Sequence, residues 1–177
     1  IQKSSQEEKN DLAFAFEGWN MLKTINQLSK THKARVYLDG RKLPSYSYDL
    51  LRWCPMFLNW TNYILPGKFD KDSIKDHDEG RVVIPYFNRV GQFFCYQGRS
   101  LNPNSDAKYI TINLDKTQPA IYGVDKVNFN KDIFAFEGPI DSFFIPNAVA
   151  FSGGSANHLT KVLPYSRLVA VFDNEPH

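Results

Sequence analysis

The sequence predicts an α/β protein, with an α+β N-terminal lobe followed by a small domain built on a parallel sheet. Near the N-terminus, apolar residues recur at three- and four-residue steps, which is typical of an amphipathic helix. The middle of the chain becomes extended and rich in β-branched and aromatic residues. The last third alternates short apolar strands with short helical segments. We therefore expect two domains, at residues 1–127 and 128–177.

The composition excludes several classes of protein. Of the 177 residues, 42% are hydrophobic, which is enough for a real core and excludes a disordered or low-complexity chain. The longest apolar runs, such as 133–136 and 168–172, are far shorter than the roughly 20 residues needed to span a bilayer, so no membrane partner is expected. A net charge of +2 provides no overall basic field, so any nucleic acid must be held by a local patch.

The cysteines and the chain ends indicate where the protein works. Cys54 and Cys95 form no CxxC pair, which excludes a disulfide scaffold or a zinc site and favours a reducing, cytoplasmic location. The chain begins at Ile1 with a polar stretch, so no secretory signal is visible. It stops at His177, directly after an acidic cluster, and we expect a fragment of a longer protein that is truncated within its second domain.

The N-terminal elements are predicted from periodicity and from breakers. The pattern predicts a helix over 11–28, then a short helix or strand over 34–38 that ends at Asp39-Gly40. Residues 46–65 form a mostly helical, aromatic segment interrupted at Pro55, which we expect to pack in the core. Residues 70–79 alternate acids and bases, which predicts a solvated loop.

The extended segments begin after Gly80. Residues 81–87 and 92–97 are expected to form a hairpin around Gly91, with further strands at 109–114 and 120–122. In the last third, strands at 133–136, 148–151 and 168–172 alternate with helical segments at 140–145 and 155–163. Continuous apolar strands with this alternation predict a parallel sheet covered on both faces.

Acidic residues follow two of these predicted strands. Glu137 comes directly after the first, Asp173 and Glu175 come just after the third, and Asp141 lies one helical turn beyond Glu137. Because ligands collect at the carboxyl ends of parallel strands, these carboxylates are candidates for a Mg²⁺ or Mn²⁺ site. The alternative is that they cap helices or face water, and it is weaker for Glu137 and Asp173 than for Asp141.

An internal repeat provides a control. The pentapeptide FAFEG occurs at residues 14–18 and again at 134–138. The first copy lies in a 3.6-residue pattern and has no acid four residues after Glu17, whereas the second ends a predicted strand. We therefore assign chemistry only to the second copy.

Basic residues of the middle region form a complementary set. Arg81 precedes one predicted strand, Arg99 follows another in the sequence Gln97-Gly98-Arg99, and Lys108 precedes Tyr109. Arginine offers a planar fork of donors for phosphate, and lysine offers a compact charge. Each cation alone is more often an ordinary surface residue.

These residues together resemble a known family. Glu137-Gly138-Pro139-Ile140-Asp141, followed by Asp173-Asn174-Glu175, is similar to the Toprim signature of bacterial-type primases, topoisomerases and related nucleases. Upstream, the blocks at 81–87, 97–99, 108–111 and 121–123 resemble the primase catalytic core that precedes Toprim, and 34–44 resembles the start of that core more loosely. The amino-acid sequences of the two acidic blocks are most similar to those of phage-encoded primases.

The resemblance implies a function and a set of roles. It implies an enzyme that synthesises short RNA primers on single-stranded DNA by nucleotidyl transfer, with NTPs as substrates and a replicative helicase as a partner. Glu137, Asp173 and Glu175 match the catalytic and metal-binding acids, and Asp141 matches a further metal-binding acid. Arg81, Arg99, Lys108 and Tyr109 match residues near nucleotide and template. Glu175 stands where the common pattern has Asp, and the zinc module and helicase domain of the family have no counterpart in the sequence.

Two other functions remain open at this stage. A Toprim nuclease or topoisomerase fragment needs the acids but has no need of the blocks around Arg99 and Lys108. A non-catalytic module that binds single-stranded DNA needs the cations but not the acids.

Overall fold

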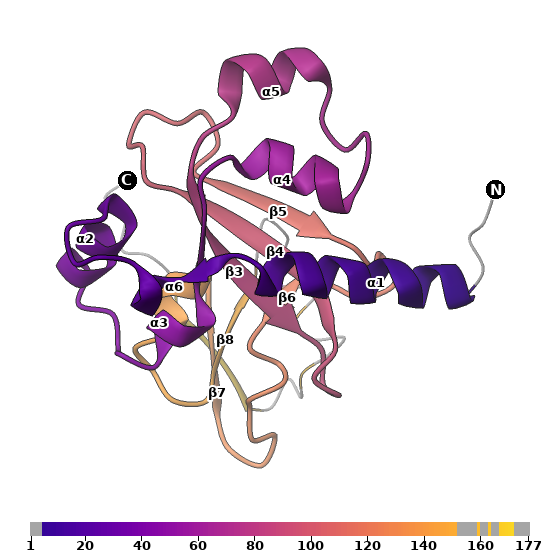
Figure 1. The fold of residues 1–177 in the computed structure, drawn as a ribbon. Coiled ribbons are helices and arrows are strands. Elements are labelled where there is room, and N and C mark those ends of the chain that lie inside the picture. The colour runs from indigo at the N-terminus through magenta and orange to yellow at the C-terminus, as the bar shows by residue number, and fades with distance from the viewer. Residues whose placement is uncertain (1–4, 152–158, 160–162, 164–166, 172–177) are drawn as a thin grey trace. The chain divides into compact units, whose positions relative to one another are not determined.

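The computed structural model describes residues 5–151, 159, 163 and 167–171 (Figure 1). By their internal contacts, residues divide into two compact units. The first comprises Ile1–Pro85 and Tyr96–Leu114, and the second comprises Tyr86–Cys95 and Asp115–His177. The predicted division of the sequence near residue 127 stays a prediction.

The first unit contains most of the helices. They are α1 (Ser5–Asn20), a 3₁₀ helix (Ile25–Gln27), α2 (Lys33–Gly40), α3 (Ser47–Leu50), α4 (Phe57–Ile64) and α5 (Lys71–His77). Helix α1 packs against α4, with the rings of Phe14 and Tyr63 5.3 Å apart and the Trp60 indole N–H donating to the Gly18 carbonyl oxygen at 3.3 Å. A Cβ at Gly18 would lie 3.1 Å from the Ile64 side chain, so a residue without a side chain allows this close approach.

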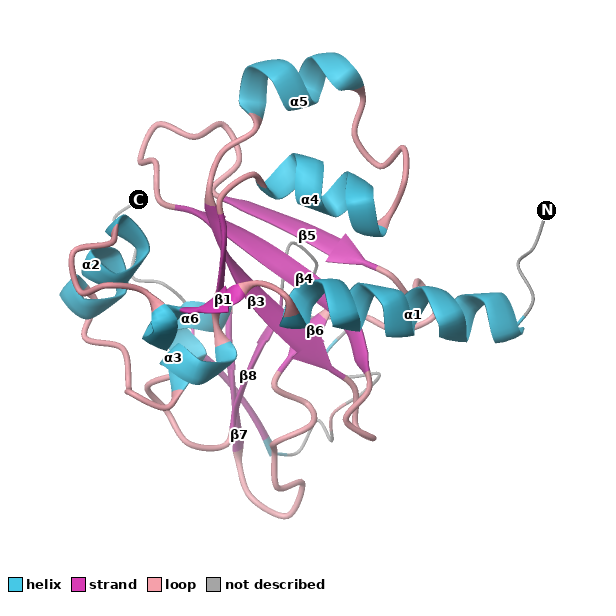
Figure 2. Cartoon of the chain, viewed as in Figure 1, coloured by secondary structure: helices cyan, strands magenta, loops and turns pink. Residues whose placement is uncertain are grey.

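A five-stranded sheet has the order β1-β2-β3-β4-β5 (Figure 2). Its strands are β1 (Lys23–Thr24), β2 (Arg52–Cys54), β3 (Arg81–Phe87), β4 (Phe93–Ser100) and β5 (Tyr109–Asn113). Strand β4 is buried along its whole length, and Gly91 has a φ of 76° in the β3–β4 turn. The predicted hairpin is therefore confirmed, and its tip, Tyr86–Cys95, belongs to the second unit.

The second unit contains a four-stranded sheet with the order β6-β8-β7-β9. Strand β7 (Ile133–Phe136) runs parallel to both β8 (Ala148–Phe151) and β9 (Leu168–Val171), and the short helix α6 (Pro139–Ser142) follows β7. The edge strand β6 (Ile121–Tyr122) pairs antiparallel with β8. The predicted parallel arrangement is confirmed, with one antiparallel strand added at its edge.

The N-terminal helix is shorter than predicted. The apolar period continues to Leu28, but α1 ends at Asn20. Thr24 and Gln27 then form a capping box: the Gln27 N–H donates to Thr24 Oγ1 at 3.1 Å, and the Thr24 N–H donates to Gln27 Oε1 at 2.9 Å. This local cap starts the 3₁₀ helix, so the apolar residues beyond Asn20 belong to separate elements.

Two other predicted segments differ from the structure. Within 46–65, the strand β2 separates α3 from α4, and Trp53 pairs antiparallel with Val82 of β3. Residues 70–79, predicted as a loop, contain helix α5. The helix predicted over 155–163 falls mostly outside the described residues.

No helix in the described part of the chain is both long enough and apolar enough to cross a membrane.

Candidate functional site

Arg99 is a buried cation of the predicted set. It lies on β4 with 8% of its surface exposed, and its Nη2 donates to the Tyr37 hydroxyl at 3.0 Å while Nη1 donates to the Lys108 carbonyl oxygen at 3.4 Å. The guanidinium carbon also lies 4.8 Å from the centre of the Tyr109 ring and 5.7 Å from that of Tyr37. Two tyrosines and one carbonyl therefore hold the charge of Arg99 in place.

Lys108 differs from Arg99 in that its charge is exposed. Its backbone carbonyl accepts from the Ser100 N–H at 3.0 Å and from Arg99, which ties the start of β5 to the end of β4. The structure thus brings Arg99, Lys108 and Tyr109 together in the first unit, with Lys108 as the cation open to an incoming anion.

Arg81 lies in the same unit but is buried, with 3% of its surface exposed. Its Nη1 donates to the carbonyl oxygens of Gly98 (3.1 Å) and Ala107 (2.8 Å), and its Nη2 donates to Glu79 Oε1 (2.6 Å) and Ser105 Oγ (3.2 Å). Burial lowers the pKa of Arg81, and the neighbouring Glu79 carboxylate opposes that shift. The guanidinium therefore braces both ends of the β4–β5 loop.

Glycine at position 98 serves packing within this region. A Cβ there would lie 2.4 Å from the ring of Phe57, a side chain that is fully buried. The absence of a side chain at Gly98 therefore allows β4 to pass directly beneath the ring of Phe57, the first residue of α4.

Two residues that matter here were not singled out from the sequence. Glu79 and Ser105 complete the Arg81 network, since the Ser105 hydroxyl donates to Glu79 Oε1 at 2.8 Å. Glu79 was assigned to the solvated charge run, and nothing in the local pattern separates it from its neighbours. Only the pairing of distant segments in the fold reveals its role.

The predicted acids divide between described and undescribed residues. Glu137 follows β7 directly and is exposed, and Asp141 is half-buried in α6. Asp173 and Glu175 lie outside the described residues. The parallel register pairs Phe136 with Val171, so the last described residues of β7 and β9 lie side by side.

The side-chain oxygens of the predicted acids are suitable ligands for some metal ions and not for others. Glu137 and Asp141 offer carboxylate oxygens, which suit a hard cation such as Mg²⁺. Within the ranges that the structure describes, no three potential ligands from among His, Cys, Asp and Glu gather at one point. The donor type therefore fits a divalent cation, and the complete ligand set stays a prediction.

Both cysteines are free and buried, so the expectation that they form no disulfide is confirmed. Burial raises the pKa of the Cys54 thiol to about 12 and also raises that of Cys95. Both thiols are therefore protonated at neutral pH and unsuited to act as nucleophiles.

A pocket of about 240 Å³ lies elsewhere in the second unit, between the β3–β4 turn and the segment that leads into β6. Its wall includes Arg89, Val90 and Phe94 from the hairpin, and Pro119 and Ile121 from the later segment. Among the predicted site residues that the structure describes, none lines this pocket.

Comparison with known proteins supports the resemblance seen in the sequence. The chain is 35% identical over 153 residues to the DNA primase of Enterobacteria phage T4, an alignment that covers 86% of this chain and 43% of the relative. The chain thus spans less than half the length of that relative. No protein-family model matches the chain.

Solved structures show the same fold. The RNA polymerase domain of the Mycobacterium tuberculosis primase DnaG matches with a TM-score of 0.65 at 18% identity, covering 97% of this chain and 68% of that domain. A DnaG primase catalytic domain bound to single-stranded DNA also matches with a TM-score of 0.65, at 17% identity, covering 95% of this chain and 64% of that one. In sequence and in fold, the predicted resemblance to DNA primase catalytic cores is confirmed.

Proposed function

We propose that the chain is the catalytic core of a DNA primase, which synthesises short RNA primers on single-stranded DNA by metal-dependent nucleotidyl transfer. The similarity to the phage T4 DNA primase over 86% of the chain carries this proposal. The cations of the first unit and the exposed carboxylate after β7 provide the chemistry that such a reaction needs.

The acids are assigned to the metal. Glu137, Asp141, Asp173 and Glu175 would hold Mg²⁺ or Mn²⁺ at the carboxyl edge of the second sheet. When bound, the ion supplies positive charge that stabilises the negative charge developing on the transferred phosphoryl group. Glu137 is exposed directly after β7, and its alternative role would be to accept the proton of the attacking 3′-hydroxyl.

The cations are assigned to phosphates. Lys108 would bind the triphosphate of an NTP or a template phosphate directly, because its charge is exposed. Arg99 would add a fixed charge beside it, and Tyr109 would offer a ring face for stacking with a base. For Arg81, whose Nη1 and Nη2 donate to protein acceptors, we propose a positioning role through Ser105 and Ala107.

The partners of the proposed enzyme follow from its reaction. It would bind single-stranded DNA and NTPs and would act beside a replicative helicase. We infer a phage-encoded enzyme that works in the cytoplasm of a bacterial host, which the similarity to a phage primase supports.

Primer synthesis by the full-length protein tests the proposal. With a single-stranded template, Mg²⁺ and labelled NTPs, we expect the wild type to make short RNA products and Lys108→Ala to reduce the rate about 100-fold. Lys68→Ala, which removes an exposed lysine between α4 and α5, is the matched control and should act like the wild type. Absence of RNA products from the wild type would reject the proposal, and DNA cleavage without NTPs would assign a nuclease instead.

A further inference from the structure

The first unit contains two buried arginines, Arg81 and Arg99, whose surroundings differ. Arg81 forms an ion pair with Glu79, in which Nη2 lies 2.6 Å from Oε1. Burial lowers the pKa of Arg81, the Glu79 carboxylate opposes that shift, and the positive charge of Arg99 adds to it. The two guanidinium groups therefore lie within electrostatic range of each other, and Arg99 experiences the repulsion of a second buried cation.

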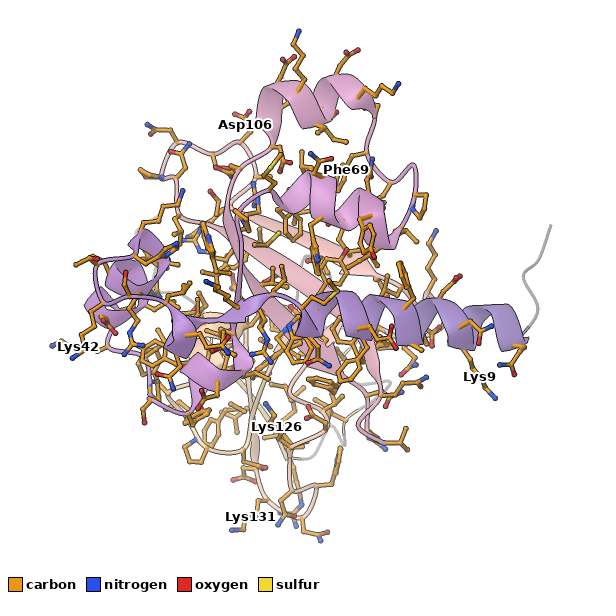
Figure 3. All side chains as sticks on the ribbon, in the orientation of Figure 1. Lys9, Lys42, Phe69, Asp106, Lys126 and Lys131 are labelled. Atoms are coloured by element: carbon orange, nitrogen blue, oxygen red, sulfur yellow. The ribbon has the colours of Figure 1, made fainter. Side chains whose placement is uncertain are left out.

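Arg99 forms no ion pair with any acid that the structure describes. Asp78 also acts on this cluster, but its Oδ1 accepts from the Leu58 N–H at the start of α4 at 2.7 Å. Asp106, in the loop between β4 and β5, is exposed (Figure 3). Because a buried charge is costly without a partner of opposite charge, Arg99 is suited to receive an anionic ligand.

The two arginines also differ in how many of their donors are used. Arg81 donates four hydrogen bonds through Nη1 and Nη2. Arg99 donates two to the described residues, from Nη2 to the Tyr37 hydroxyl at 3.0 Å and from Nη1 to the Lys108 carbonyl at 3.4 Å. Its Nε is buried and has no acceptor in the described part of the chain. Arg99 thus keeps donor capacity of the kind that phosphate oxygens accept.

Tyr37 is the side chain that fixes the orientation of this guanidinium. It belongs to α2, which is anchored by the fully buried side chains of Ala34 and Leu38. Besides accepting the hydrogen bond from Arg99 Nη2, its ring lies with its centre 5.7 Å from the guanidinium carbon. A tyrosine is a rigid side chain with few rotatable bonds, so an anchored helix transmits its position to the hydroxyl. The long side chain of Arg99 then has less conformational freedom to lose when a ligand binds.

We propose that Tyr37 is a positioning residue, whose hydroxyl holds the guanidinium of Arg99 in the orientation in which its remaining donors bind a phosphate group. The phosphate belongs either to an NTP or to the template backbone, and the same donors serve both. The inference rests on the proposed function in that it takes Arg99 as a phosphate-binding residue. Tyr37 itself acts through Arg99 and needs no contact with the ligand.

A double-mutant cycle between Tyr37 and Arg99 tests this role. The full-length wild type, Tyr37→Phe, Arg99→Gln and the double variant are titrated with Mg²⁺-ATP by calorimetry. They are also titrated with a fluorescein-labelled oligodeoxythymidylate about 20 nucleotides long by anisotropy. Loss of the hydroxyl alone should weaken binding of at least one ligand about tenfold. If Tyr37 acts through Arg99, the double variant should bind that ligand within about twofold of Arg99→Gln.

The matched control removes another hydroxyl that is hydrogen-bonded to α2. The Tyr48 hydroxyl donates to Asp39 Oδ1 at 2.7 Å. Tyr48→Phe therefore loosens the same helix without touching Arg99, and we expect it to bind both ligands within about twofold of the wild type. Thermal unfolding establishes that each variant is folded. Where Arg99→Gln is unfolded, Arg99→Lys takes its place in the cycle, because lysine keeps the charge but lacks the planar fork of donors.

The two ligands distinguish the source of the phosphate. A loss confined to Mg²⁺-ATP assigns Arg99 to the triphosphate, a loss confined to the oligonucleotide assigns it to the template, and each supports the positioning role. Unchanged binding of both ligands by Tyr37→Phe would overturn that role. So would losses that multiply in the double variant, or an equal loss in Tyr48→Phe.

Primer synthesis by the wild type separates this inference from the proposed function. If the cycle shows the expected coupling but the wild type makes no primers, the role of Tyr37 stands and the proposed primase function fails. If the wild type makes primers but the losses multiply, the proposed function stands and the role of Tyr37 fails.

Discussion

The sequence placed Arg81 in the right part of the molecule but did not reveal what its guanidinium contacts. From the sequence, an arginine ahead of an apolar strand was a candidate phosphate ligand. In the structure its guanidinium is buried and donates to Glu79, Ser105 and two backbone carbonyls. These partners compensate in part for the loss of water around the guanidinium, and removing the guanidinium alone would leave them without one of their donors. Its burial depends on residues about 20 positions away, which no local pattern reveals.

Replacing Arg81 distinguishes a role in holding the fold together from direct contact with the nucleotide. Arg81→Met removes a donor from Glu79 and from the carbonyls of Gly98 and Ala107, so we expect the free energy of unfolding to fall by about 3 kcal/mol in urea titrations. Lys71→Met on the exposed face of α5 is the control and should change it by less than about 0.5 kcal/mol. Unchanged stability together with weakened NTP binding would instead show that Arg81 contacts the nucleotide.

At the scale of elements, the repeated pentapeptide shows how context decides structure. FAFEG at 14–18 is helical within α1, whereas at 134–138 its first three residues belong to strand β7 and Glu137 follows the strand end. Flanking residues caused the difference: the first copy continues a 3.6-residue period, and the second is followed by Gly138-Pro139. The prediction that the two copies differ is confirmed, because periodicity reaches beyond five residues.

The prediction for residues 70–79 was wrong in structure although correct in exposure. No residue of α5 is buried, as a solvated segment requires. The helix forms because Asp70 caps it, with Oδ1 accepting from the Ser73 N–H at 2.7 Å and Oδ2 accepting from the Ser73 hydroxyl at 2.9 Å. Asp72 in the first turn and Lys75 in the last complement the helix dipole. Asp70 followed by Ser73 is a sequence typical of a helix N-terminus, but the alternating charges of this segment favoured a loop instead.

The Asp70 cap predicts a pH-dependent helix. Hydrogen bonds from the Ser73 backbone and hydroxyl hold the pKa of Asp70 below its usual 3.8. A carboxyl whose pKa is lower in the folded state stabilises that state above the unfolded pKa, and the effect disappears as pH falls through the folded value. We therefore expect full protection of the α5 amides at pH 7 and its loss below about pH 3.8.

Amide hydrogen exchange measures this effect. Asp70→Ala should lower the protection of the α5 amides, relative to their intrinsic exchange rates, at neutral pH, as low pH does in the wild type. Asp76→Ala, near the other end of the helix, removes a charge that opposes the dipole and should leave protection equal or higher. Equal protection in Asp70→Ala and the wild type at pH 7 would contradict the assigned cap.

At the scale of the whole molecule, the sequence was sufficient for the fold class and for most of the strands. The apolar segments at 133–136, 148–151 and 168–171 predicted a parallel sheet. In the structure the first of these strands pairs in parallel with the other two. The strand order β6-β8-β7-β9 and the antiparallel edge strand β6 were not predicted. Pairing partners depend on contacts distant in sequence, whereas periodicity reports only which face of a segment is buried.

In the candidate site, too, the residues were predictable from the sequence, whereas contacts between distant residues were not. The resemblance singled out Arg99, Lys108 and Tyr109, and the structure brings these three together. Glu137 lies at the carboxyl end of β7, where the sequence placed it. Tyr37, which links Arg99 to α2, was noted only within a loosely similar block, because its hydrogen bond spans 62 positions.

The role of Glu137 in primer synthesis is tested most directly by one substitution and its internal control. In the full-length protein with template, Mg²⁺ and NTPs, we expect Glu137→Gln to lower the rate of primer synthesis about 100-fold or more while single-stranded DNA binding is retained. Glu17→Gln alters the exposed acid of the first FAFEG copy and should leave the rate unchanged. Undiminished synthesis by Glu137→Gln would contradict the account.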